Sequence, residues 1–108
     1  MALKVLMLRS RINERQRALD ALRNAADSFM SREAELAADI DAAATDEERS
    51  VIDEAIEAFD QERAANEAEQ ARIAGEIADY ERQIGEIESA ASQARSAAHG
   101  AENRGREN

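Results

Sequence analysis

The sequence contains no cysteine, proline or tryptophan, and only three aromatic residues among its 108 positions. Without cysteine, the chain forms no disulfide and offers no thiolate for catalysis or metal binding. The longest run of large apolar residues, Val5 to Leu8, is far shorter than the roughly 18 residues of a membrane span. We find no signal-peptide pattern after Met1. We therefore expect a cytosolic chain that begins at its initiator methionine and has no membrane partner.

Alanine is the most abundant residue, with 25 copies, and glutamate and arginine are also frequent. This composition is typical of long helices and coiled coils, and the length allows one domain at most. Large apolar residues recur at alternating spacings of three and four, which is the pattern of a coiled-coil seam. The sequence therefore predicts an all-α fold. The expected interface residues are Leu8, Ile12, Leu19, Leu22, Phe29, Leu36, Ile40, Ile52, Ile56, Phe59, Ile73, Ile77, Tyr80, Ile84 and Ile87.

The spacing pattern of the seam residues is interrupted once, around residues 42–48. The phase slips there by two residues, which a continuous coiled coil does not absorb. Thr45 and Glu48 also form a capping-box pattern at the start of a helix. The sequence predicts a helix over about 3–43, a turn at 44–46 and a second helix over about 46–95. Together they make an antiparallel hairpin domain over 1–95.

Folding the chain back at this turn pairs residues whose numbers sum to about 92, so that Leu19 lies near Ile73. Three successive seam positions of the second helix are polar: Arg63, Asn66 and Gln70. Polar seam residues weaken an interface but reject wrong registers. Arg63 falls opposite Phe29 in this register, which suggests a cation–π contact.

Two helices alone bury little surface. We therefore expect the hairpin to self-associate into a bundle, with Met7, Met30 and Val51 among the residues that complete it. Residues 96–108 carry no bulky apolar residue and are predicted to be a flexible linker or tail. Gly75 and Gly85 lie inside the second helix, where either close helix contact or local flexibility would explain them.

Charge is distributed unevenly. Residues 1–23 hold six basic and two acidic side chains, whereas residues 33–69 hold two basic and fourteen acidic ones. The net charge of −10 argues against a nucleic-acid partner, whose phosphates it would repel. The basic N-terminal turns are expected to complement acidic residues on a neighbouring helix.

No set of residues resembles an active site, and we predict that the chain is not an enzyme. His99 is the only histidine, and it has no second imidazole or thiolate with which to form a metal site. The serines have no base partner, and the glycines form no phosphate-binding loop. We expect no catalytic, metal-binding or cofactor-binding residues.

Several stretches resemble the N-terminal delta domain of Hong Kong-type tailed-phage major capsid proteins. They are Met1 to Leu6, the basic run Arg11 to Leu22, the acidic turn Thr45 to Arg49, Phe59 to Glu62, and the isoleucine-rich segment Ile73 to Glu88. The resemblance covers roughly residues 1–95 and implies that a β-rich capsid domain follows the linker.

The resemblance also implies a function. Delta domains act as scaffolds inside the immature shell, in the cytoplasm of the bacterial host, and a maturation protease removes many of them. The implied partners are other capsid subunits, the protease and the portal. The alternative is a freestanding coiled-coil adaptor that binds partner helices. The adaptor hypothesis predicts that the open reading frame ends near Asn108.

Overall fold

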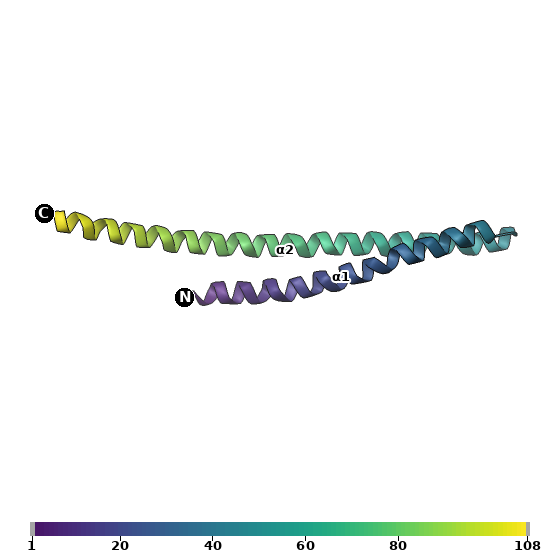
Figure 1. Cartoon of the computed structure of the whole chain (residues 1–108), viewed down its shortest axis with the longest axis horizontal. Coiled ribbons are helices and arrows are strands. Elements are labelled where there is room, and N and C mark those ends of the chain that lie inside the picture. Colours follow the sequence, from purple (N-terminus) through teal and green to yellow (C-terminus); the bar gives the residue numbers. More distant parts are fainter. Residues whose placement is uncertain (1, 108) are drawn as a thin grey trace.

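The computed structural model describes the backbone of residues 2–107 and the side chains of residues 2–95. It consists of two helices, α1 (Leu3–Ala42) and α2 (Asp46–Glu107). The two lie side by side and antiparallel (Figure 1), and form a rod with extents of 94 × 19 × 16 Å. The predicted all-α helical hairpin is therefore confirmed.

Helix α2 continues well past the start of α1 (Figure 1) and ends at Glu107, not near residue 95. The linker expected over 96–108 thus has a helical backbone as far as Glu107, and Asn108 lies outside the described residues. Alanine, arginine and glutamate favour helix, no proline interrupts the segment, and each glycine costs only about 1 kcal/mol. Within α2, a Cβ added at Gly75 or Gly85 would meet no atom within 4 Å. Close helix contact is therefore not the reason for either glycine.

The turn is short and capped on both sides. Helix α1 ends at Ala42, and Ala43 takes an extended conformation while its N–H donates to the Asp39 carbonyl at 3.0 Å. The Thr45 hydroxyl accepts the Glu48 N–H at 3.1 Å, as the capping box predicts. The Glu48 carboxylate, however, accepts the N–H of Ala44 at 2.8 Å instead of that of Thr45. Acidic residues in the first turn of α2 also suit the positive end of its dipole.

The core is a narrow stripe between the two helices. Its central cluster is formed by Leu19, Ile73 and Ile77, with Ile12, Ala18 and Leu22 packed against it. Val5 and Leu8 are also buried near the start of α1, and Phe29 and Phe59 are buried further toward the turn. Because the contact is only one stripe wide, both outer faces of the rod stay exposed to solvent.

Candidate interaction surfaces

The first surface is the seam between α1 and α2. All the predicted interface residues are buried or half-buried except Ile40, which is 52% exposed. Ile40 lies in the last turn of α1, where the helices end and few neighbours remain to cover it. The prediction missed Val5, which is 5% exposed and lines one hollow together with Ile87. Extending the seam spacing three residues before Leu8 would have found it.

Ion pairs flank this seam and join the two helices. The Arg15 Nε lies 2.5 Å from a carboxylate oxygen of Glu76, and a guanidinium nitrogen of Arg32 lies 2.8 Å from one of Glu62. A weaker contact of 3.2 Å joins Arg9 to Glu88. The hydrogen bond that Arg15 donates to the Glu76 carboxylate raises the pKa of Arg15. Pairs as exposed as Arg9–Glu88 contribute little stability individually, but together with the half-buried pair Arg15–Glu76 they favour one antiparallel register.

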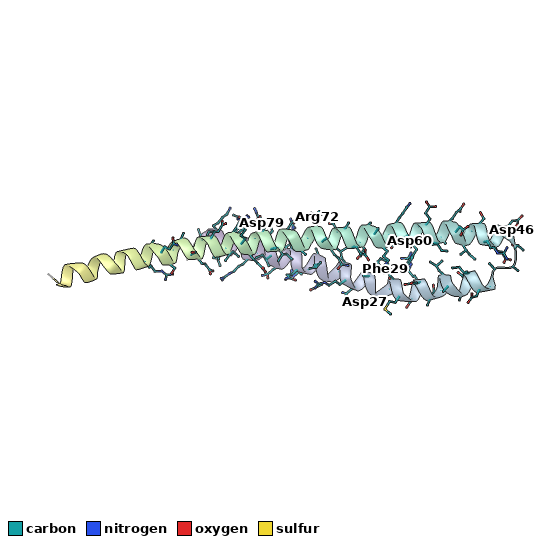
Figure 2. All side chains as sticks on the ribbon, turned by 90° about the horizontal axis from the view of Figure 1, so that it is seen from above. Asp27, Phe29, Asp46, Asp60, Arg72 and Asp79 are labelled. Carbon is teal, nitrogen blue, oxygen red and sulfur yellow. The ribbon has the colours of Figure 1, made fainter. Side chains whose placement is uncertain are left out.

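Phe29 and Phe59 meet across the two helices in a T-shaped contact, with ring centroids 5.7 Å apart and planes at 88°. Phe29 lies in α1, part-way between the turn and the start of the chain (Figure 2). The Arg32 guanidinium lies 5.7 Å from the centroid of Phe29 and 5.2 Å from that of Phe59. The cation–π contact expected from Arg63 is therefore made by Arg32. The sequence did not single out Arg32, although it lies three residues after Phe29 and thus one turn along the same face.

The three polar residues predicted in the seam differ in burial and in their partners. Asn66 is buried, with 8% exposure, and its side-chain N–H donates to the Leu22 carbonyl at 3.0 Å. Gln70 donates in turn to the Asn66 side-chain oxygen at 2.5 Å. Arg63 instead has a half-exposed side chain, with carboxylates of Glu33 and Glu67 at 3.8 and 3.5 Å. Asn66 and Gln70 are thus satisfied polar seam residues, whereas Arg63 lies at the exposed edge of the seam, where it contacts Glu33 of α1.

Helix α2 also carries charge pairs along its own surface. Arg72 hydrogen-bonds to both Glu69 and Glu76, and Arg82 contacts Asp79 and Glu86 at 2.5 and 2.7 Å. Arg72 and Asp79 both lie in the central part of α2 (Figure 2). The hydrogen bonds from Arg82 and Gln83 lower the pKa of Asp79. Pairs three and four residues apart stabilise a helix locally. Helix α2 is longer than α1, so packing against α1 does not support all of it and such local stabilisation suits it.

The second surface is the exposed apolar one. Large apolar side chains that remain exposed are Leu3, Leu6, Met7, Met30, Ile40 and Val51. They include Met7, Met30 and Val51, which the sequence analysis assigned to contacts between hairpins. The exposed fractions of these three are 45%, 80% and 66%. Their side chains are therefore open to contact with another molecule.

Among the side chains of residues 2–95, no three histidine, cysteine or acidic groups gather as metal ligands. Neither helix, in its described part, contains an apolar stretch long enough to cross a membrane. His99 lies outside the described side chains. Comparison of the chain with protein-family models, curated proteins and solved structures finds no match.

Proposed function

We propose that this hairpin is a self-associating scaffold, and that it serves as the scaffolding segment of a phage major capsid protein. One observation carries the self-association: the core of the hairpin is one stripe wide, while large apolar side chains such as Leu3, Met30 and Val51 remain exposed. Leu3, Leu6 and Met7 gather on one face of the first turns of α1, and contiguous exposed apolar patches mark contact sites between proteins.

The shape of the hairpin supports a scaffolding role. A rod 94 Å long and less than 20 Å across offers neighbours long sides on which to make many weak contacts. When each rod is joined to a subunit of a shell, such contacts raise the local concentration of subunits without requiring a tight interface. A seam that contains Asn66 and Gln70 is also weaker than a fully apolar one, as suits a part that is later released.

The capsid part of the proposal depends on the resemblance of residues 1–95 to delta domains. On this proposal the hairpin lies inside the immature shell, contacts the portal and is removed by a maturation protease. The protease cuts beyond the hairpin, and Arg95, Arg104 and Arg106 are candidate positions for the cut.

Self-association is tested first, by sedimentation equilibrium of the whole chain over a range of micromolar concentrations. We expect a reversible dimer or larger species, and a helical chain that stays monomeric throughout would contradict the proposal. The capsid role is tested by reading the gene past the codon for Asn108. A continuing frame that encodes a strand-rich domain supports it, whereas an immediate stop codon favours the adaptor.

If the frame continues, the hairpin is deleted from the full-length protein. We expect aberrant shells or none from this deletion, because subunits lose the contacts that set their assembly geometry. Normal shells from the deletion would overturn the scaffolding role.

A further inference from the structure

The first turns of α1 carry an exposed stripe that is both apolar and basic. Leu3 and Met7 lie four residues apart on one face and are 81% and 45% exposed. Lys4 and Arg11 flank them, and the Arg11 guanidinium contacts the Met7 sulfur at 3.9 Å. Among the described side chains, neither cation lies within 4.0 Å of a carboxylate. We call Leu3, Lys4, Met7 and Arg11 the basic stripe.

The turn end of the rod is apolar and acidic, whereas the start of α1 is apolar and basic. A hollow of about 350 Å³ there is lined by Asp39, Ala42, Ala43, Glu48, Val51 and Ile52. The hollow is shallow, four of its lining residues are apolar and two carry carboxylates, and Val51 is 66% exposed. Within the described part of the chain, Asp39 has no basic group within 4.0 Å. We call this set of residues the acidic hollow.

The charges of α1 also oppose its own dipole. Lys4 lies in the first turn, at the positive end, and that turn has no acidic residue. Asp39 and Asp41 lie in the last turn, at the negative end, which has no basic residue. Both arrangements are unfavourable in an isolated hairpin. A partner that brings anions to the start of α1 and cations to its end would relieve both.

A second copy of the same chain meets this requirement. The basic stripe and the acidic hollow lie at opposite ends of α1, roughly 50 Å apart at 1.5 Å per residue. Two hairpins placed side by side and antiparallel bring each stripe onto the other hollow at the same time. This arrangement has two-fold symmetry and closes as a dimer. A parallel pair would instead place like charges together.

We propose that two hairpins form an antiparallel dimer in which the basic stripe of each copy covers the acidic hollow of the other. Leu3 and Met7 then pack on Val51 and the alanines at the turn, while Lys4 and Arg11 face Asp39 and its neighbours. The inference rests on the proposed self-association and specifies its geometry.

The test uses two variants of the whole chain. Variant A carries Lys4→Glu and Arg11→Glu, and variant B carries Asp39→Lys with Glu35→Lys, one turn earlier on the same face. The changes at Lys4 and Asp39 bring α1 into agreement with its dipole, so that neither variant is expected to lose helix. Circular dichroism of each checks this.

Each variant alone should dimerise at least about tenfold more weakly than the wild type at low ionic strength, because four charge contacts become repulsive. An equimolar mixture should form an A–B dimer of near wild-type affinity, since both of its contacts pair opposite charges. In 1 M salt, where the screening length is about 3 Å, this preference should disappear. Arg17→Glu with Arg23→Glu is the matched control: it changes the net charge as variant A does, but lies outside the stripe.

Sedimentation of the variants and of the mixture separates the outcomes. Homodimers of A and B as tight as the wild type, or a mixture that does not recover affinity, would overturn the antiparallel pairing while leaving self-association intact. A control variant weakened as much as A would overturn it too. A wild-type chain that stays monomeric would overturn the proposed self-association and this dimer together.

Discussion

The two halves of the hairpin are held together by different interactions. The open half, where α1 begins, contains the buried aliphatic residues Val5, Leu8, Leu19, Ile73 and Ile77. In the turn half, over residues 32–58, the seam residues Leu36, Ile52 and Ile56 are only half-buried and Ile40 is exposed. Phe29 and Phe59 mark the border between the two. Burial is thus greatest at the end where no covalent link joins the helices.

The difference has a physical reason. A connection of three residues keeps the ends of α1 and α2 close together, so that little burial is needed there to offset the loss of chain entropy. Further along, the helices can separate, and only packing and ion pairs such as Arg15–Glu76 hold them. The turn half can therefore leave apolar and acidic groups exposed for contacts with another molecule.

The strongest test of this comparison uses one leucine from each half. Leu19 is 4% exposed in the open half, and its replacement by alanine should lower the free energy of unfolding by about 3 kcal/mol. Leu36→Ala in the turn half should cost only about 1 kcal/mol, because its side chain is already half in solvent. Urea denaturation at several protein concentrations gives both values and separates any contribution from association. Equal losses would contradict the contrast between the halves.

Asn66 is the buried polar residue of the seam and provides the next test. Asn66→Ala removes the hydrogen bond to Leu22 and leaves Gln70 without its acceptor, and should cost about 2 kcal/mol. Asn66→Leu is the control, because it removes the polar group but keeps apolar contact across the seam. It should be close to neutral or stabilising. A large loss from the leucine variant would show that the hydrogen bonds themselves contribute most of the stability.

The long-range features of this fold were predictable because they depend on periodicity. The alternating spacing of apolar residues specifies two helices, and the phase slip near Thr45 specifies the turn. The register sum of about 92 brings Leu19 to Ile73, which the structure places in one cluster. Local side-chain choices were not predictable in the same way. Spacing alone could not decide that Arg32, instead of Arg63, reaches the phenylalanines, because both long side chains lie near the seam.

The end of α2 was mispredicted for a related reason. The pattern of apolar residues reports on packing, and it stops near residue 91. Helix formation also depends on intrinsic propensity, which alanine and arginine supply without any partner. Helix α2 therefore continues to Glu107, although the seam does not.

The cap at Thr45 tests whether the turn half depends on backbone capping. Thr45→Ala removes the hydroxyl that accepts the Glu48 N–H and should cost about 1 kcal/mol. Thr45→Ser retains the acceptor and should cost much less. Hydrogen exchange should show faster opening of the first turns of α2 in the alanine variant, with the open half little changed. Uniformly faster exchange along both helices would mean that the two halves unfold as one unit.

The smallest expected effect concerns the pair Arg32–Glu62, just outside the aromatic contact between the halves. The hydrogen bond from Arg32 lowers the pKa of Glu62 below its usual value of 4.5. A carboxyl whose pKa is lower in the folded chain stabilises it above the unfolded pKa, and loses this contribution as the pH falls through the folded value. At pH 7, Glu62→Gln should therefore melt slightly below the wild type, by less than Thr45→Ala does. This difference should disappear as the pH falls below 4.5 and through the lowered pKa of Glu62. Glu57→Gln is the control, because no basic group lies within 4.0 Å of Glu57 among the described side chains. An equal, pH-dependent loss of stability in that variant would show that net charge, and not the pair with Arg32, is responsible.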